Sequence, residues 1–543
     1  MANAHYRVPT PHNEGNLSYA PGSPERAALK ASLSALRSRE IEIPVVVGGE
    51  EVRTGRIVEV RLPHRHGHVI ARYHQAGPRE VARAVEAAAR ARREWGAADW
   101  PERAAVFLRA AELLAGPWRQ VLNGATMLGQ SKTAFQAEID SACEIVDFWR
   151  FNVAFADGIY AQQPISPPGV WNRVQYRPLE GFVFAVTPFN FTSIAANLPT
   201  APALLGNAVL WKPASTAVYS GWHVLKLLEA AGLPPGVVNF LPGPGEAVGD
   251  AVLASPEFAG LHFTGSNSVF DAMWRAIAGH LDRYRSYPRI VGETGGKDFV
   301  FAHASADPDE LVTALVRGAF EYQGQKCSAA SRAYVPTSLW PAVRERLVAR
   351  AASLPVGDVE DFRNFMGAVI DRAAFERIRE FVELARASPE ARILTGGGAD
   401  PSTGWFVEPT VVETTNPRFR LMEEEIFGPV LTVFPYPDAE LEEALALCDS
   451  TSRYGLTGAV FARDRRAIAR IAAALEGSAG NFYVNDKPTG AVVGQQPFGG
   501  ARRSGTNDKA GSPGNLLRWI SPRAIKENLS PPTRIEYPHQ GEA

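Results

Sequence analysis

The sequence predicts an α/β protein with two doubly wound lobes and a small β arm. Short apolar runs, such as 181–187 and 207–212, are each followed by a helical pattern, which is typical of buried parallel strands joined by helices. The same alternation resumes after residue 297. Residues 164–170 are rich in proline, serine and glycine, and the segment 171–180 that follows resembles an exposed edge strand outside either lobe.

The composition excludes several classes of protein. The 543 residues carry a formal charge of −2, from 56 basic and 58 acidic residues, whereas a general nucleic-acid or membrane-surface binder needs a basic excess. No stretch approaches the ~18 apolar residues of a membrane helix, and residues 1–16 lack the apolar core of a secretion signal. Cys143, Cys327 and Cys448 have no metal-ligand spacing, so we expect no metal, no disulfide and a cytoplasmic protein.

The first lobe opens with a capped helix at Ser23-Pro24, followed by mixed elements. Periodicity predicts strands within 43–62 and at 68–73, 181–188, 207–213, 237–242 and 260–265. It predicts helices at 78–115, 117–156 and 219–231. Asp140, Glu144 and Asp147 recur at helical spacing, a pattern usual for a solvated face.

The second lobe shows a similar alternation. Strands are predicted at 298–303, 332–336, 391–395, 406–414, 430–436 and 458–462. Helices are predicted at 307–322, 337–353, mainly within 366–387, and at 438–449 and 464–475. The glycine-rich loop 494–513 is too long for a simple turn and is therefore expected to be functional, and 516–526 is predicted as a last strand.

Candidate nucleotide-binding residues follow the strands of the first lobe, although the chain has no Gly-x-Gly-x-x-Gly after its first strand. Ligands of open α/β sheets bind beyond the carboxyl ends of the strands. Lys212 can reach ribose hydroxyls, and Ser266 at a helix start can donate to a phosphate. Each feature alone is more often a turn or a helix cap, but four occur in succession: Thr187-Pro188-Phe189-Asn190, Lys212 to Ser215, Gly243 to Gly249 with Gly245, and Thr264-Gly265-Ser266.

Cys327 lies in the stretch Phe320-Glu-Tyr-Gln-Gly-Gln-Lys-Cys-Ser-Ala-Ala330 and is the candidate nucleophile. Glu293 lies shortly before it in Gly-Glu-Thr-Gly-Gly, so a thiol, a carboxylate and flexible backbone fall within one short span. These groups suffice for covalent catalysis followed by hydrolysis. The alternative for an isolated cysteine is a small buried apolar residue, which suits Cys143 and Cys448.

Seven short motifs in this order resemble the aldehyde dehydrogenase superfamily. They are Pro188-Phe-Asn190, Trp211-Lys-Pro213, Phe263-Thr-Gly-Ser266, Gly292-Glu-Thr-Gly-Gly296, Gly324-Gln-Lys-Cys327, Glu424-Glu-Ile-Phe427 and Pro497-Phe-Gly-Gly500. The resemblance implies an NAD-binding domain at 1–159 and 182–296, and a catalytic domain at 297–489. It also implies an oligomerisation arm at 160–181 and 514–543, and a substrate-anchor loop at 490–513. Because the arm presents exposed sheet edges, we expect a homodimer or a larger homo-oligomer.

The resemblance implies a role for each catalytic and cofactor-binding residue. Cys327 is the nucleophile, Asn190 and the Cys327 amide stabilise the oxyanion, and Glu293 is the base that activates water for thioester hydrolysis. Glu425 and Phe427 hold the nicotinamide ribose and ring. The implied cofactor site comprises Thr187, Pro188, Phe189, Lys212, Ser215, Gly245, Gly249, Thr264, Gly265, Ser266, Val269, Gly295, Glu425 and Phe427.

Three further stretches carry a closer resemblance: Phe189-Asn-Phe-Thr192, Phe320 to Ala329 and Gly494 to Lys509. Over nearly the whole chain, the sequence resembles the branch of the superfamily that oxidises glutamate γ-semialdehyde in proline catabolism. This resemblance implies that Ser328 and the backbone of Gly490 and Ala491 receive the substrate carboxylate, and that Glu144 faces its ammonium. Phe191 and Phe498 would flank the aliphatic chain. Some members of the branch have serine where this chain has Ala491.

Two departures bear on the cofactor, and two alternatives bear on the function. Ser215 replaces the glutamate that repels a 2′-phosphate in many relatives, so we expect NAD to be preferred and leave NADP open. Phe270 stands about where the family has a glycine.

The first alternative is another semialdehyde dehydrogenase, such as one for succinate semialdehyde, which needs no ammonium partner. The second is a catalytically silent member, against which Cys327, Glu293 and Asn190 argue. A transient contact with proline dehydrogenase is a further expectation.

Overall fold

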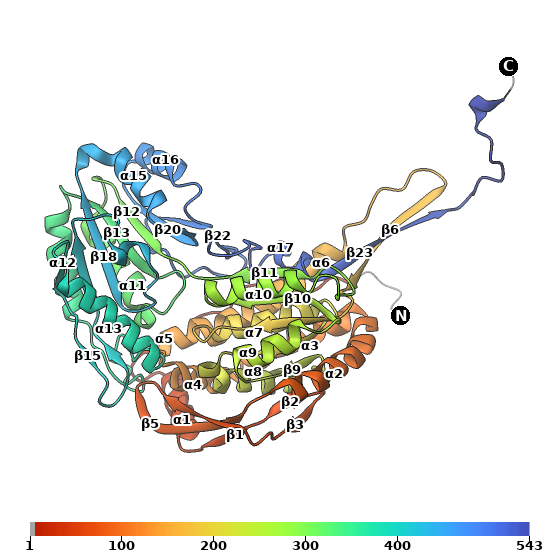
Figure 1. Cartoon of the computed structure of the whole chain (residues 1–543), viewed down its shortest axis with the longest axis horizontal. Helices are drawn as coiled ribbons and strands as arrows, with labels where there is room; N and C mark the ends of the chain where they lie inside the picture. Colours follow the sequence, from red (N-terminus) through yellow and green to blue (C-terminus); the bar gives the residue numbers. More distant parts are fainter. Residues whose placement is uncertain (1–5, 542–543) are drawn as a thin grey trace.

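The computed structural model describes residues 6–541, so the extreme ends of the predicted segments 1–159 and 514–543 lie outside the described residues. Two α/β lobes sit side by side, and a long two-stranded ribbon projects from the first lobe (Figure 1). The predicted fold class, two doubly wound lobes with a β arm, is confirmed. No helix within 6–541 is both long and apolar enough to cross a membrane.

The first lobe is built on a seven-stranded sheet, parallel except at the β2 and β3 edge. Its strands in spatial order are β11 (Arg289–Glu293), β10 (Phe258–Thr264), β7 (Phe182–Val186), β8 (Ala208–Lys212), β9 (Val238–Phe240), β2 (Val45–Val47) and β3 (Glu50–Val52). Alternate residues of the central strands enter two separate cores: Val183 and Ala185 pack with one, Phe182 and Phe184 with the other. Both faces of this sheet are therefore covered by helices, as a doubly wound fold requires.

The first face carries α7 (Thr192–Leu204) and α8 (Val218–Ala230), and α4 (Arg119–Gln130) packs against α8. The second face carries α2 (Pro78–Ala97), α9 (Gly245–Leu253) and α10 (Asn267–Gly279). The remaining helices around this lobe are α1 (Pro24–Arg37), α3 (Trp100–Ala115), α5 (Ala134–Ala137) and α6 (Ile145–Tyr160). A separate three-stranded sheet lies beside them, with β1 (Ile41–Ile43), β5 (Arg65–His74) and β4 (Ile57–Leu62).

The second lobe repeats the arrangement, with only its β14 edge antiparallel. Its strands are β14 (Ala391–Thr395), β17 (Thr410–Thr414), β18 (Val430–Tyr436), β13 (Ala330–Pro336), β12 (Asp298–Ala302), β20 (Thr457–Phe461) and β21 (Asn481–Val484). Helices α11 (Pro308–Phe320) and α12 (Trp340–Ala352) cover one face. Helices α13 (Arg372–Ala387), α15 (Leu441–Ser450) and α16 (Arg465–Ala474) cover the other.

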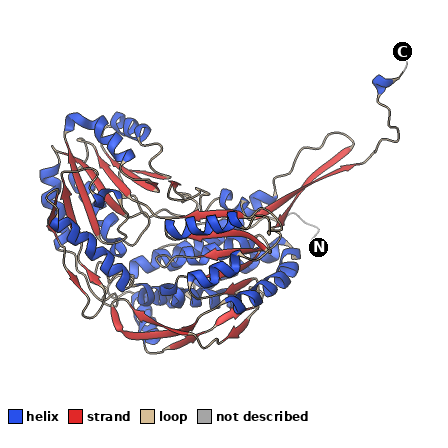
Figure 2. Ribbon diagram, in the orientation of Figure 1, coloured by secondary structure: helices blue, strands red, loops and turns tan. Residues whose placement is uncertain are grey.

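The ribbon consists of β6 (Val170–Pro178) and β23 (Ile520–Asn528), paired antiparallel over nine residues. Figure 2 shows that it extends beyond the body of the protein and that the chain after β23 continues outward past its tip. Ile165 and Trp171 on this projection are largely exposed. The short elements α14 (Arg420–Glu423), α17 (Pro513–Leu517), β15 (Ala399–Asp400), β16 (Phe406–Val407), β19 (Tyr454–Gly455) and β22 (Ala501–Arg502) complete the fold.

Three sequence predictions differ from the structure. The segment 366–387 is helical only from residue 372, because Asp371 caps the helix by accepting the Ala374 amide. The segment 516–526 begins as the short helix α17, started by Pro513, before it becomes a strand. Between α5 and α6 the helical segment widens into a π-helix, Glu138–Glu144. The predicted domain limits stay predictions, although β11 belongs to the first sheet and β12 to the second.

Candidate active site

The Cys327 segment follows α11 and is shaped by a run of left-handed residues. Tyr322, Gln323 and Gly324 have φ values of 52°, 55° and 66°. A side chain at Gly324 would lie 2.2 Å from the Gly428 carbonyl oxygen, so only glycine fits there. The Gln323 amide donates to the carbonyls of Ser131 and Ala368, which fixes this strained turn. The turn thereby sets the direction in which the chain reaches Cys327.

Cys327 opens into a cavity of about 810 Å³ between the lobes. Glu293 also lines this cavity. All six predicted substrate residues line it as well: Glu144, Phe191, Ser328, Gly490, Ala491 and Phe498. The structure therefore brings together a thiol, two carboxyl groups and the anchor loop, which come from four separate stretches of the chain. Their individual roles remain predictions.

The environment of Cys327 opposes the thiolate. Burial, followed by the charges of Glu293 and Asp298, raises the pKa of the Cys327 thiol well above its usual value. Lys326 precedes Cys327, but its ammonium lies 3.3 Å from Glu321, and burial lowers its pKa to about 8. A base must therefore take the thiol proton when the sulfur reacts.

Glu293 ends β11, and burial raises the pKa of its carboxyl to about 8. Lys509 acts in the opposite direction and favours the ionised form. The backbone after Glu293 is constrained by close contacts: a Cβ at Gly295 would meet the Glu425 carboxylate at 2.3 Å, and one at Gly296 would meet the Cys327 carbonyl oxygen at 2.2 Å. These glycines let Glu293, Glu425 and Cys327 occupy one small volume.

Asn190 follows β7 and is buried, but it does not border the cavity. Its side-chain amide donates to the Gln325 carbonyl at 3.1 Å. One of its two amide hydrogens therefore ties the strand end to the Cys327 segment. Its predicted contact with an oxyanion would need the second hydrogen, and that role stays a prediction.

Glu144 ends the π-helix and reaches the cavity with a carboxyl group that accepts a hydrogen bond from Ser193 Oγ at 3.0 Å. Burial, reinforced by Asp140, raises its pKa to about 8. The solvated-face alternative for this acidic series is wrong, because Asp140 and Asp147 are also buried. An ammonium placed in the cavity would lower the pKa of Glu144 by favouring its ionised form.

Ser328 and Gly490, the first residue of the anchor loop, both line the cavity. Ser328 Oγ donates to Thr489 Oγ1 at 2.8 Å. Gly490 has φ +99°, a conformation that other residues rarely adopt, and Lys487 Nζ donates to the Thr489 carbonyl at 3.0 Å. Phe498 is held by an isolated bridge to Ala510. The loop thus presents backbone beside the thiol, which suits recognition of a carboxylate by N–H groups.

The predicted cofactor residues gather at the carboxyl ends of β7, β8 and β10, together with the start of α9, but among them only Thr264 borders the cavity. Lys212 is buried, donates to Pro213 O at 3.2 Å, and has a pKa lowered to about 8 by burial. Ser266 is the N-cap of α10 without a side-chain cap bond, and Val269 on that helix is 47% exposed. A buried ammonium and two helix starts at one sheet edge fit a dinucleotide.

A second group of predicted cofactor residues lies near the catalytic lobe. The Glu425 carboxylate accepts the Gly296 amide at 2.9 Å, and burial raises its pKa to about 7. Phe427 has φ +56°, and its ring meets Phe189 edge to face at 5.8 Å. Phe270, where the family has glycine, stacks on Phe263 at 5.2 Å and fills the space over Gly292. The departure is thus accommodated by packing.

Several residues at the site escaped sequence reasoning. Arg317 and Lys487 line the cavity near the anchor loop, where they add positive charge. Asn13 and Glu14 form part of its wall, since Asn13 donates to Asp147 and to the Val493 carbonyl. Only the position of Lys326 beside Cys327 carried a signal in the sequence. The others come from distant stretches, so no local pattern marks them.

The amino-acid sequence is similar to those of several named proteins. The chain is 52% identical over 539 residues to "Delta-1-pyrroline-5-carboxylate dehydrogenase, mitochondrial" of Dictyostelium discoideum, covering 99% of this chain and 97% of the relative. It is 50% identical to the Homo sapiens protein of the same name, covering 96% and 92%. These names contradict the expected cytoplasmic location. That expectation was wrong because composition and the lack of a secretion-signal core do not distinguish among reducing compartments.

The fold has a close match among solved structures. The Delta-pyrroline-5-carboxylate dehydrogenase from Mycobacterium tuberculosis, bound with NAD, has a TM-score of 0.97 and 54% identity, and each chain is covered completely. The model of the aldehyde dehydrogenase family matches residues 51–525. The chain therefore belongs to the aldehyde dehydrogenase family and, within it, to the group of Delta-1-pyrroline-5-carboxylate dehydrogenases.

Proposed function

We propose that this enzyme oxidises L-glutamate γ-semialdehyde, formed from Δ1-pyrroline-5-carboxylate, to L-glutamate with NAD in proline catabolism. The observation that carries the proposal is the single cavity shared by Cys327, Glu293, Glu144 and the anchor loop. A thiol and a base suit oxidation of an aldehyde to an acid, while a carboxyl group and a backbone nest suit the two charged groups of an amino acid. The relatives of about 50% identity bear the matching name.

The chemistry assigned to this chain has two stages. The Cys327 sulfur adds to the aldehyde carbon, its proton leaves to a base, and Asn190 with the Cys327 amide binds the oxygen that gains negative charge. Bound NAD supplies the acceptor for the hydride that leaves this carbon. Glu293 then takes a proton from water, the water oxygen attacks the thioester carbon, and the carbon–sulfur bond breaks to release the acid and the thiol.

Substrate specificity rests on both ends of the cavity. Glu144 in its ionised form pairs with the α-ammonium, and Ser328 with the backbone of Gly490 and Ala491 receives the α-carboxylate. Phe191 and Phe498 enclose the methylenes. Ser215 puts no carboxylate where a 2′-phosphate would lie, so NADP is proposed as a weaker second cofactor.

The decisive experiment is a steady-state assay of NAD reduction with glutamate semialdehyde and with succinate semialdehyde, repeated with NADP. We expect a strong preference for glutamate semialdehyde and for NAD. A preference for succinate semialdehyde would contradict the assignment of Glu144. Undiminished NAD reduction by Cys327→Ser would contradict the covalent mechanism as a whole.

We also propose that the ribbon joins copies of this chain, because it projects from the body and exposes Trp171. Light scattering should give at least a dimer, and Trp171→Glu should lower the mass, whereas Tyr287→Glu, at an exposed residue outside the ribbon, should not. A transient contact with proline dehydrogenase would bring the substrate to the cavity. The test compares the rate at which proline is converted to glutamate by the two enzymes mixed together with the rate when a membrane keeps them apart, and a faster rate in the mixture is expected.

A further inference from the structure

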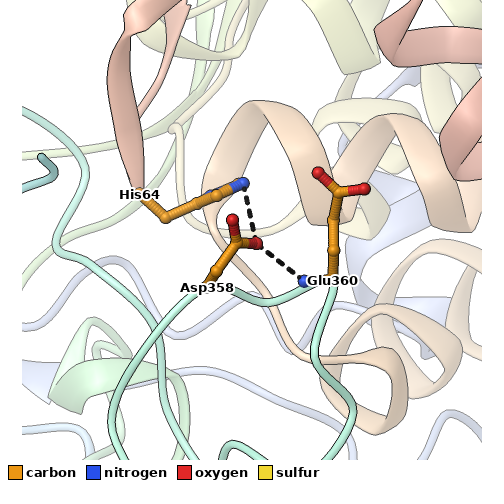
Figure 3. Close-up of side chains that lie close together, drawn as sticks. All are labelled: His64, Asp358 and Glu360. Atoms are coloured by element: carbon orange, nitrogen blue, oxygen red, sulfur yellow. Dashed lines mark hydrogen bonds and ion pairs between the residues drawn. The ribbon is translucent and has the colours of Figure 1, made fainter.

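A histidine and two carboxylates meet where the first lobe touches the second. His64 lies in the turn between β4 and β5, and Asp358 and Glu360 lie in the loop between α12 and α13. Figure 3 shows the three side chains directed into one small space. One ligand atom from each residue can be chosen so that all three lie within 4.8 Å of one another. None of these residues belongs to the cavity at Cys327.

His64 is a buried polar side chain without a hydrogen-bond partner. The residue is 2% exposed, and neither ring nitrogen has such a partner within residues 6–541. Its Nε2 faces Asp358 Oδ1 at 3.6 Å, which is beyond hydrogen-bond length. Buried imidazoles normally bind a donor, an acceptor or a metal, so this orientation toward two carboxylates points to a ligand.

Each of the two carboxylates already contacts an arginine. Arg65 binds Asp358 through Oδ2, and Arg37 binds Glu360 through Oε1 at 3.1 Å. The Glu360 amide donates to Asp358 Oδ1 at 2.9 Å, the oxygen that faces the histidine. Such outer contacts fix the direction of ligating carboxylates in metal sites.

We propose that His64, Asp358 and Glu360 bind a Zn²⁺ ion. One imidazole nitrogen and two carboxylate oxygens, with water in the fourth position, form a ligand set that zinc accepts. A tetrahedral ion with bonds of about 2.0–2.2 Å holds its ligands ~3.4 Å apart. The pair of His64 Nε2 and Asp358 Oδ1 already has this spacing at 3.6 Å, and a small movement of the Glu360 side chain completes the set.

The ion would connect the first lobe to a loop that supports the nucleophile segment. The loop that carries Asp358 continues to Ala368, which accepts a hydrogen bond from Gln323, and to Ile370, which donates to Gln325. Both glutamines stand just before Cys327. The bound ion is therefore structural: it holds together the two surfaces on which the Cys327 turn rests, without touching the substrate cavity.

The test uses the full chain with Cys327→Ser, which removes the cavity thiol as a competing zinc ligand. The protein is stripped with a chelator, dialysed against ZnCl₂, and analysed for bound metal and for Tm. We expect one zinc per chain and a Tm higher by about 2 °C at an ion concentration 100-fold above the dissociation constant. His64→Ala should abolish both the stoichiometric zinc and the Tm shift.

Matched variants in the same loop keep the test decisive if His64→Ala folds poorly. Asp358→Asn should remove zinc binding, whereas Asp361→Asn, which alters a neighbouring exposed carboxylate paired with Arg363, should retain it. Equal zinc content and equal Tm shifts in Asp358→Asn and Asp361→Asn would overturn the proposal. Failure of the unsubstituted full chain to take up zinc would overturn it as well.

Discussion

Lys132 Nζ lies 2.6 Å from Asp140 Oδ2, and both side chains are almost completely buried beside the substrate cavity. Asp140 also accepts the backbone N–H groups of Thr192 and Ser193, at 3.0 and 2.9 Å, and so anchors the start of α7. Lys132 lies 4.2 Å from the centre of the Phe191 ring. One ion pair thus positions the segment that bears Asn190 and Phe191.

Asp140→Asn should destabilise the protein, because it leaves the Lys132 ammonium buried without its counter-charge. Removing one partner of a buried pair costs about 3–5 kcal/mol, which for a chain of this length lowers Tm by roughly 3–4 °C. Scanning calorimetry measures the shift. The control Asp309→Asn, at an exposed pair with Arg346, should stay within about 0.5 °C. Equal shifts in the two variants would contradict a structural role for the buried pair.

Glu293→Gln should block hydrolysis of the thioester while sparing its formation. Loss of a general base typically costs roughly 10²–10⁴-fold. Rapid mixing with NAD and substrate should therefore show a first burst of NADH followed by almost no turnover. If the burst itself disappears, Glu293 is required earlier, as the acceptor of the thiol proton.

The hydrolysis step should accelerate with rising pH. Burial raises the pKa of Glu293 to about 8, and only the ionised carboxylate can take a proton from water. The base is therefore lost as the pH falls below about 8 and present above it. In the wild type kcat should rise through this pH, provided that hydrolysis limits the rate, and in Glu293→Gln the residual rate should not follow this profile.

Glu144→Gln should weaken recognition of the substrate ammonium with little change in the chemical step. A hydrogen bond to a charged group contributes about 1.5–3 kcal/mol, so KM for glutamate semialdehyde should rise roughly 10- to 100-fold. KM for succinate semialdehyde, which lacks the ammonium, should hardly change. Since burial raises the pKa of Glu144 to about 8, wild-type KM should fall as the pH rises through that value. A parallel loss for both aldehydes would indicate a packing role.

Lys487→Met should impair capture of the substrate carboxylate. Lys487 supports the anchor loop through the Thr489 carbonyl and lines the cavity with its positive charge. KM for glutamate semialdehyde should rise several-fold, and Lys487→Arg should restore part of the loss because it keeps the charge. Pentanal, which carries no carboxylate, is the control substrate. If Lys487→Met oxidised both aldehydes normally, the lysine would have no part in recognition.

The features that the sequence could indicate are those in which a reactive side chain and the residues that shape its backbone are neighbours in the chain. The Cys327 stretch combines the thiol with the residues of its left-handed turn, and Glu293 is followed by the glycines that its neighbours require. The apolar runs at β7 and β8 predicted buried strands because helices cover both faces of the sheet. Patterns of this kind are local, and a single sequence is enough to recognise them.

Features that depend on contacts between residues far apart in the sequence could not be predicted from the sequence alone. The π-helix changes the register of Asp140 and Glu144 and turns an acidic series of solvated appearance into a buried cluster. His64 and Asp358 are separated by nearly 300 residues. Asn13 and Val493, which meet in the cavity wall, are 480 residues apart. Location in the cell was also mispredicted, because bulk composition does not report it.

The two strands of the ribbon are synthesised far apart in time. Arg173 of β6 pairs with Glu527 of β23 across 354 residues of sequence. At translation rates of about 5–20 residues per second, β6 leaves the ribosome roughly 20–70 s before its partner strand exists. During that interval an open strand edge with the exposed Trp171 is available to other nascent chains. Pairing of β6 with β23 therefore has to wait until residues 520–528 have been made.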